Sequence, residues 1–213
     1  MMSRSARGVS ITGLLGSVTC IVILHVVRSD LSPISTRLSE YANGPYGWAM
    51  TLAFVALSIG LATLGASLWV DRRPNTVAWT FLATALLAAA GTILSAIFRT
   101  GASEISETIH SRASATGVVA VVALALMYSL PYTRNPRGSN LDRVGIGLAG
   151  VAASLALMSP LLHHSRWTGL SQRLLWASLI VWLLRTAWQQ TRSGTVRNGS
   201  GVERTTSPSH TSP

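Results

Sequence analysis

The sequence predicts an all-α, polytopic membrane protein in which six transmembrane helices form one bundle. Hydrophobic residues make up 48% of the 213-residue chain and charged residues only 11%, compared with about 25% charged residues in an ordinary soluble domain. The apolar residues are also gathered in six separate runs. Each run is close to the roughly 20 residues that a helix needs to cross the hydrocarbon of a bilayer.

The six runs are interpreted as helices in chain order, because none has a charge at its centre. The first resembles a signal peptide, but no A-x-A-like cleavage site follows it, so we expect an uncleaved helix. The next four are separated by polar or turn-like connections such as DRRPNT and TRNPRGSN. The sixth has Arg173 and Arg185 near its ends, where long side chains can reach the interface. The predicted spans are 8–27, 47–70, 77–98, 113–132, 144–162 and 170–188.

The arginines predict the orientation of the bundle. Eleven lie in the N-terminus, the second and fourth loops and the C-terminal end, whereas the other three loops carry six. Because short basic loops stay in the cytoplasm, we expect both termini to be cytoplasmic in a multi-pass protein of the cell (inner or plasma) membrane. Residues 1–7 are then a cytoplasmic N-terminus, 8–188 the transmembrane domain and 189–213 a disordered cytoplasmic tail.

Membrane lipids are the expected partners. A net charge of +10 is typical of nucleic-acid binding as well, but the arginines flank apolar runs and form no basic face, so no nucleic-acid partner is predicted. Small residues four apart suit close helix packing within the bundle and, alternatively, a homo-oligomer. These pairs are Gly13 with Ser17, Ala62 with Ala66, Gly91 with Ser95 and Gly150 with Ser154.

The side chains able to do chemistry gather in the three connections on the predicted outer side. They are Ser39, Glu40, Tyr41, Glu104, Glu107, His110, Arg112, His163, His164, Gln172 and Arg173. Because these connections leave the bundle at the same end, we expect them to converge into one polar cluster. Carboxylates, imidazoles and guanidiniums at a membrane interface suit an anionic headgroup or a metal ion.

The predicted ligand-binding residues are Ser39, Glu40, Tyr41, His110, Gln172 and Arg173, and the candidate catalytic residues are His110, Glu107 and Glu40. We also expect an ion pair between Glu40 and Arg173 that ties the first outer loop to the sixth helix. Two simpler interpretations stay open. His110 can cap a helix or face water, and Glu104, Glu107 and His110, spaced three apart, fit a solvated helix face.

No cofactor and no metal site is predicted. The single cysteine, Cys20, lies within an apolar run, where an inert buried thiol is expected. The adjacent His163 and His164 cannot easily face one metal ion.

Three functional classes remain after motif inspection, because the chain has no G-x-S-x-G elbow, H-E-x-x-H, P-loop or Gly-rich dinucleotide turn. The leading hypothesis is a binding, sensing or scaffold protein, in which the polar cluster only locks the loops and no cavity lies beneath them. The first alternative is an outer-leaflet lipid-modifying or hydrolytic enzyme, which requires a pocket holding His110 and an acid. The second is a small-solute permease, but the helices offer only hydroxyls at mid-depth, and these more often bond backbone carbonyls.

The stretch LSEYANGPYGWAMTLAFVALSIG, residues 38–60, resembles the DUF998 family of prokaryotic integral membrane proteins. The resemblance rests on Ser39, Glu40 and Tyr41 in this stretch and on His110 after the third span. GLSQRLL at the start of the sixth span also matches, through the family's G-L-x-Q-R, which is met by Gly169, Gln172 and Arg173. It implies about six spans and no known biochemical role.

One departure concerns the turn after the third span. The family resemblance implies Phe-Pro-Thr-Asp there, whereas this chain has Phe98, Arg99, Thr100 and Gly101. Glu107 also stands where the family has glycine. If the family's site uses the aspartate, Glu104 or Glu107 replaces it in this chain, or the activity is lost.

Overall fold

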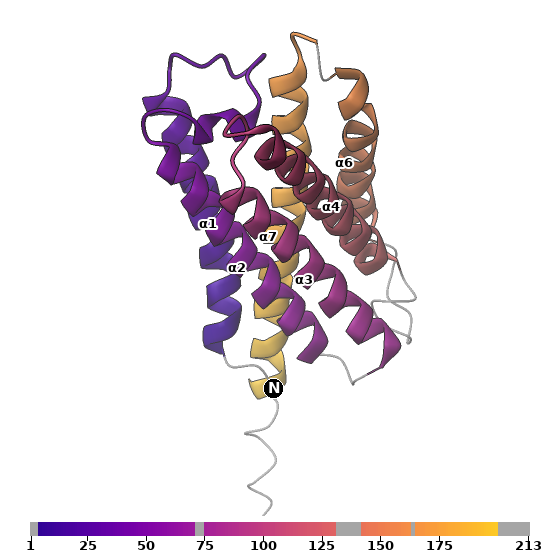
Figure 1. The fold of residues 1–213 in the computed structure, drawn as a ribbon. Helices are drawn as coiled ribbons and strands as arrows, with labels where there is room; N and C mark the ends of the chain where they lie inside the picture. Colours follow the sequence, from indigo (N-terminus) through magenta and orange to yellow (C-terminus); the bar gives the residue numbers. More distant parts are fainter. Residues whose placement is uncertain (1–3, 71–74, 131–141, 163–164, 200–213) are drawn as a thin grey trace, which may run out of the picture.

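Six long α-helices that alternate in direction make up the bundle (Figure 1). The computed structural model describes residues 4–70, 75–130, 142–162 and 165–199, and these ranges contain no strand. The elements are α1 (Arg4–Val27), the 3₁₀-helix η1 (Leu38–Ala42), α2 (Gly47–Val70), α3 (Thr76–Ile97), α4 (Glu104–Ser129), α6 (Arg143–Leu162) and α7 (Thr168–Gly199). The first described residues and the end of α7 lie at the end of the bundle opposite η1 (Figure 1).

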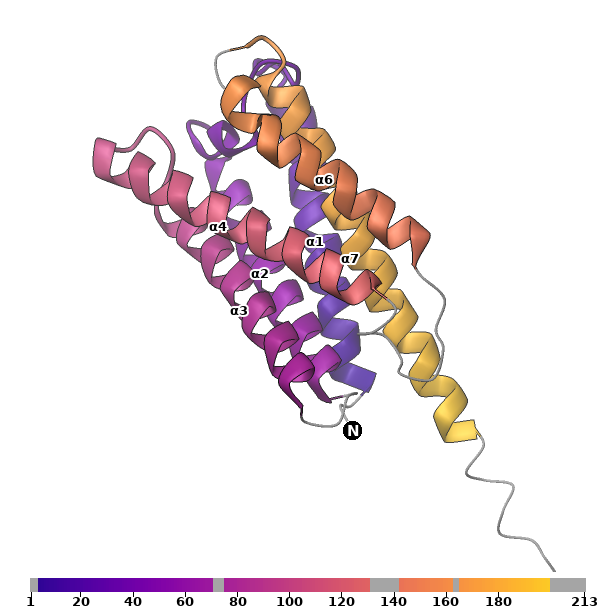
Figure 2. The same ribbon diagram turned by 90° about the vertical axis from the view of Figure 1, so that its right-hand side faces the viewer.

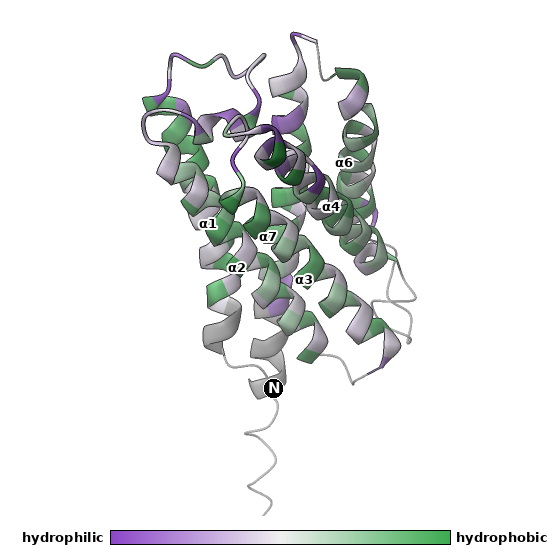
Figure 3. Cartoon of the chain, in the orientation of Figure 1, coloured by the Kyte–Doolittle hydropathy of each residue, from purple (hydrophilic) through white to green (hydrophobic). Residues whose placement is uncertain are grey.

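Five of these helices, α1 to α6, are long and apolar enough to cross a membrane. The all-α prediction is therefore confirmed for the described residues, with five apolar spans. Figure 3 shows the helices as mainly hydrophobic, with hydrophilic segments around η1 and the start of α4. The sixth predicted span, now in α7, is less apolar than the other five because it contains Arg173, Arg185 and Gln172.

Two helix boundaries differ from the prediction. Helix α4 begins at Glu104 rather than residue 113, because the Ser103 side chain accepts a hydrogen bond from the Ser106 N–H and caps the helix. The polar first turns of α4 therefore belong to the helix and not to a loop. Helix α7 continues to Gly199, so the predicted tail boundary at residue 188 is too early, and residues 200–213 lie outside the described part.

Although α7 is the least apolar helix, it contributes to the centre of the core. Leu179, Trp182 and Leu183 are fully buried and pack in one cluster with residues of the other five helices. Its two arginines lie near the ends of its buried stretch, so their charges do not enter this core. Because helix association in lipid depends on close packing, these contacts favour a fixed position for α7 inside the bundle.

Glycines set the closest helix contacts. A Cβ on Gly13 would lie 2.7 Å from Ala56 O and 2.9 Å from Gly60 N, and a Cβ on Gly91 would lie 2.6 Å from Ala113 O. These α1–α2 and α3–α4 contacts show that two of the predicted small-residue positions pack within the bundle. Gly150 on α6 has no atom within 4 Å of its Cβ position. The homo-oligomer through such faces stays a prediction.

A buried ion pair joins α6 and α7 at the end opposite η1. Asp142 is 5% exposed, and its Oδ2 contacts Arg185 Nη1 at 2.5 Å, while its Oδ1 accepts a hydrogen bond from the Gly145 N–H. Asp142 thus also caps the first turn of α6. The pair explains how an arginine within α7 is accommodated, because its charge has a partner at the helix end.

Candidate functional site

Three connections of the chain meet at the η1 end of the bundle. The Leu38 N–H donates to Gln172 Oε1 at 3.0 Å, and the Leu170 N–H donates to Ile34 O at 2.9 Å. Arg37 also reaches the first turns of α4, as described below. The segment between α1 and α2 is therefore bound to both α4 and α7. His163 and His164, in the third connection, lie outside the described residues.

Arg28 folds the segment that follows α1. Its guanidinium donates to both oxygens of Asp30 and to the carbonyl of Asn43, the last at 2.6 Å, and the residue is 8% exposed. These hydrogen bonds hold the pKa of the exposed Asp30 carboxyl below its usual range and raise the pKa of Arg28. Arg28 thus closes the 28–46 segment onto itself, a role that the sequence analysis did not assign to it.

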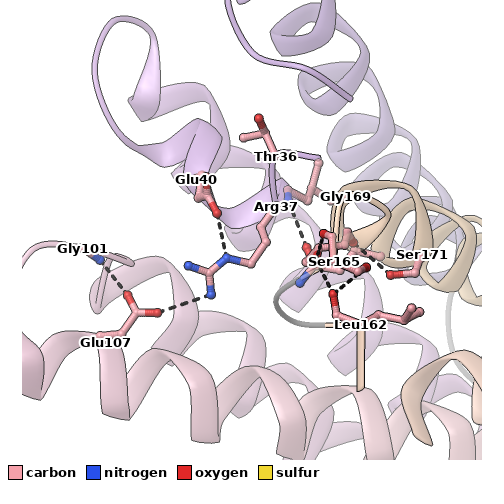
Figure 4. A network of polar contacts seen from close by, with 12 residues as sticks. Thr36, Arg37, Glu40, Gly101, Glu107, Leu162, Ser165, Gly169 and Ser171 are labelled. Atoms are coloured by element: carbon pink, nitrogen blue, oxygen red, sulfur yellow. Dashed lines mark hydrogen bonds and ion pairs between the residues drawn. The ribbon is translucent and has the colours of Figure 1, made fainter. Parts of the chain in front are cut away.

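Arg37, Glu40 and Glu107 form a group that we call the Arg37 triad (Figure 4). Arg37 Nε lies 2.7 Å from Glu40 Oε1, and its Nη1 lies 3.6 Å from Glu107 Oε1. The three side chains are between 25% and 35% exposed, so each ion pair contributes about 0.2–1 kcal/mol. One cation between two carboxylates leaves the triad with a net charge of −1.

The predicted ion pair between Glu40 and Arg173 is wrong. Arg37 lies one 3₁₀ turn before Glu40, and this i, i+3 spacing gives the carboxylate a nearer partner. Arg173 makes no ion pair in the described part of the chain. Its guanidinium is directed instead at neutral acceptors of α1 and of the segment before η1.

Arg173 is the centre of a second group, the Arg173 cluster, with His25, Thr36, Tyr41 and Gly169. Its Nε donates to His25 Nε2 at 2.8 Å, and its Nη1 donates to the carbonyls of Thr36 and Gly169 at 2.8 and 2.9 Å. His25 Nδ1 lies 2.7 Å from Ile21 O and donates there, so Nε2 is left to accept.

The ring of Tyr41 completes the Arg173 cluster. Tyr41 is fully buried, its ring stacks on His25 at a centroid distance of 4.9 Å, and the Arg173 guanidinium carbon lies 5.4 Å from its centroid. A guanidinium over an aromatic face contributes about 0.5–2 kcal/mol, more when water is excluded. Tyr41 and Arg173 therefore hold the loop segments and the start of α7 together.

The start of α7 lies against the loop backbone. A Cβ on Gly169 would lie 2.4 Å from Thr36 O and 2.9 Å from Ile34 O, closer than any side chain tolerates. Gln172 binds the first amide of η1, and Arg173 binds Thr36. The glycine, the glutamine and the arginine of the GLSQR stretch thus all contact the same loop segment, residues 34–38.

His110 caps α3 from the neighbouring helix α4. It is 6% exposed, and its Nδ1 lies 2.8 Å from Phe98 O and 3.1 Å from Ser95 O, so it donates to carbonyls at the end of α3. Its Nε2 points toward Ser114, at 3.4 Å. The helix-cap interpretation of His110 is confirmed, and Nε2 remains available to other groups.

A cavity of about 360 Å³, which we call the η1 pocket, lies between η1, α2, α4, α6 and α7. Its polar lining consists of Arg37, Ser39, His110, Ser111, Ser114, Ser159 and Gln172. Its other side chains include Met50, Phe54, Val118, Val119, Ala156, Leu175 and Trp176. Val119 is 64% exposed on the outside of the bundle, so the pocket reaches that surface. Figure 2 shows α4 and α6 diverging toward the η1 end.

The predicted residues are therefore divided between three groups. Ser39, His110 and Gln172 line the η1 pocket, Glu40 and Glu107 belong to the Arg37 triad, and Tyr41 and Arg173 belong to the Arg173 cluster. No carboxylate of the described residues lines the pocket. Sequence reasoning missed Ser111, Ser114, Ser159 and Trp176, because single serines and tryptophans in apolar helices carry no pattern.

Glu107 also reaches the turn that departs from the family pattern. Gly101, in the left-handed region with φ 77°, donates its N–H to Glu107 Oε2 at 2.7 Å. Position 101 is where the family resemblance implies an aspartate. A carboxylate from α4 thus lies beside the place of the missing acid, whereas Glu104 is exposed.

The fold and the locked loops define a multi-pass α-helical membrane protein with a pocket beneath one end. The chain belongs to the DUF998 family, described as proteins of unknown function, whose family model matches residues 11–189. This confirms the resemblance seen in the sequence. No curated protein and no solved structure matches the chain.

Proposed function

We propose that this protein binds an amphiphilic membrane molecule in the η1 pocket, with the headgroup among the loop residues and the chain between α4 and α6. The pocket has polar groups beside η1, including Ser39, His110 and Gln172, and apolar groups such as Phe54 and Trp176 on the helices. Its volume is at the lower end of the roughly 300–1,000 Å³ of small-molecule sites. This combination within one cavity is the observation that supports binding.

The locked loops support the same function. The Arg173 cluster and the Arg37 triad fix η1 over the pocket, so the headgroup side is preorganised. Little conformational entropy of the loops is then lost when a ligand binds. The expectation that the loops cover no cavity is wrong, because the η1 pocket lies beneath them. A scaffold needs only the locked loops, whereas a binding or sensing protein uses both the locked loops and the cavity.

The two other classes have less support. The enzyme hypothesis requires an acid beside His110 in the pocket, and the described lining residues include none. The permease hypothesis requires a polar path at mid-depth, whereas the hydroxyls of Ser58, Thr63 and Thr92 donate to the carbonyls of Ala89, Ile59 and Ala88. In the described part of the chain, no three His, Cys, Asp or Glu side chains gather to hold a metal ion.

The proposal includes six spans, because α7 shares the buried core with the five apolar helices and runs alongside them (Figure 1). Its arginines are each held by partners, Arg173 by loop carbonyls and Arg185 by Asp142. The arginine bias places the η1 end on the outer face of the plasma membrane, and both termini in the cytoplasm.

We predict that Val119→Trp abolishes retention of a bound lipid. Val119 lines the pocket and is 64% exposed, so a larger side chain there can enter the opening without disturbing the core. The protein is purified in mild detergent, and retained lipid is counted by native mass spectrometry. We expect one retained lipid in the parent protein and at least a tenfold loss in Val119→Trp, because an occupied opening removes the cavity.

The matched control for this experiment is Val151→Trp on α6. Val151 is 53% exposed and does not line the pocket. It should retain lipid as the parent does. Equal retention by Val119→Trp and the parent would contradict binding in this pocket.

We predict that Asn43→Cys, made in a Cys20→Ser background, is labelled by a membrane-impermeant maleimide added outside cells. Asn43 is exposed between η1 and α2, and Thr76 is exposed at the start of α3, at the other end of α2. Thr76→Cys is therefore the control and should be labelled only after the membrane is opened. The reverse labelling pattern would invert the proposed orientation.

A further inference from the structure

We propose that the ligand of the η1 pocket has an uncharged headgroup that bears at least one hydroxyl, as in a monoacylglycerol, and not an anionic one. This inference rests on the proposed binding function and names the class of ligand. The inference follows from two pocket groups that can form further hydrogen bonds, His110 Nε2 and the Gln172 NH₂ group, and from the net charge of the Arg37 triad at the pocket edge.

The first step is an acceptor with only a long contact. In the neutral imidazole of His110, Nδ1 donates to the α3 carbonyls, so Nε2 can only accept. Ser114 Oγ lies 2.8 Å from Ser95 Oγ but 3.4 Å from His110 Nε2, and the latter distance is at the long limit of a hydrogen bond. His110 Nε2 can therefore accept a shorter hydrogen bond from a donor of the ligand.

The second step is a donor without an acceptor. Gln172 Oε1 accepts the Leu38 N–H, which assigns the other amide atom as the NH₂ group. This NH₂ has no hydrogen-bond partner within the described ranges, and Gln172 lines the same pocket. A hydroxyl or an ester satisfies it. A headgroup that both donates and accepts fits the two vacant positions, whereas a phosphate or carboxylate offers acceptors only.

The third step is the charge of the pocket edge. Among the described residues, Arg37 is the only charged residue of the lining, and its guanidinium is already paired with Glu40 and Glu107. The net charge of this triad is −1, so an anionic headgroup meets repulsion and no free cation. Without such compensation, a charged headgroup loses its hydration when it enters.

The volume supports a ligand with a small headgroup. A cavity of about 360 Å³ holds a headgroup and part of one chain, and the opening beside Val119 lets the rest of the chain lie in lipid. A two-chain phospholipid is larger than this space. The inference is therefore a neutral, hydroxyl-bearing amphiphile that enters sideways between α4 and α6.

The test compares three probes with the same chain on the full-length protein. Monooleoylglycerol, methyl oleate and oleate are presented at equal mole fraction in detergent micelles, and the bound species are measured by native mass spectrometry. We expect monooleoylglycerol to be retained about tenfold more than methyl oleate, because one hydrogen bond to a buried acceptor is worth about a factor of ten. Oleate should be retained least. His110→Phe should remove the preference for monooleoylglycerol over methyl oleate.

The outcomes separate the two proposals. If oleate or methyl oleate is retained as well as monooleoylglycerol by the parent protein, and Val119→Trp retains none of them, the pocket binds amphiphiles but the headgroup class is wrong. If Val119→Trp retains the probes as the parent does, or the parent retains none, the binding function itself fails. The probe series on the parent decides the headgroup class even if His110→Phe does not fold.

Discussion

Gly169→Ala should lower the free energy of unfolding by about 3 kcal/mol. The added methyl would lie 2.4 Å from Thr36 O, 2.9 Å from Ile34 O and 2.8 Å from Arg173 Nη1. Two of these atoms belong to the loop backbone, which cannot rotate away as a side chain does. The start of α7 must therefore move off the loop, and the hydrogen bond from the Leu170 N–H to Ile34 O is lost.

Gly147→Ala is the matched control, measured by unfolding in mixed detergent micelles. Gly147 lies in the exposed part of α6 and has no atom within 4 Å of its Cβ position. Alanine there should raise stability by about 0.5–1 kcal/mol, because it restricts the unfolded chain. If the two variants unfold alike, the close approach of Gly169 to the loop is not part of the native structure.

The fold was predictable because its signals are local. The length of each apolar run sets the length of one membrane-spanning helix, so five apolar helices appear where the sequence predicts them. Helix α4 starts earlier than its apolar part because Ser103 caps a polar first turn, a signal that hydropathy does not record. In the same way, α7 is less apolar than it is buried, since Arg173 donates to a loop carbonyl and Arg185 pairs with Asp142, and both partners are distant in sequence.

The site was less predictable, because it depends on which partner lies nearest. Glu40 and Arg173 both belong to the cluster that the sequence indicates, but the choice of Arg37 over Arg173 depends on one turn of 3₁₀-helix. The pocket depends on Ser114 and Trp176, whose positions on α4 and α7 matter only once those helices diverge around a cavity. Residue type indicates the end of the bundle where chemistry is possible, whereas geometry assigns the roles.

The Arg173 cluster links these roles to the binding proposal. The loop that it holds carries Ser39 into the pocket and presents the Leu38 N–H to Gln172, so two pocket groups depend on loop position. Loss of the Arg173 contacts should make η1 mobile before it affects the core of α2 to α4. Ligand binding is therefore expected to be lost under milder destabilisation than the fold.

Arg173→Met should lower the free energy of unfolding by about 3 kcal/mol, because it leaves His25 Nε2 and Thr36 O buried without a donor. The methionine fills a similar volume but carries no N–H. Hydrogen exchange followed by mass spectrometry should show faster exchange at the amides of residues 31–38, where Arg173 now anchors the carbonyl of Thr36. Arg173→Lys should lower the free energy of unfolding by somewhat less than Arg173→Met, because the ammonium can still donate to one of the two acceptors. It cannot reach both in the geometry of the guanidinium.

Arg166→Met is the control for charge and side-chain length. Arg166 is exposed, and its guanidinium carbon lies 5.1 Å from the ring of the neighbouring Trp167. Its removal should change the free energy of unfolding by no more than about 0.5 kcal/mol, as surface substitutions usually do. Exchange in residues 31–38 that stays slow in Arg173→Met would mean that Arg173 does not hold the loop. Retained lipid would then be expected to survive the same substitution, because η1 would keep its place over the pocket.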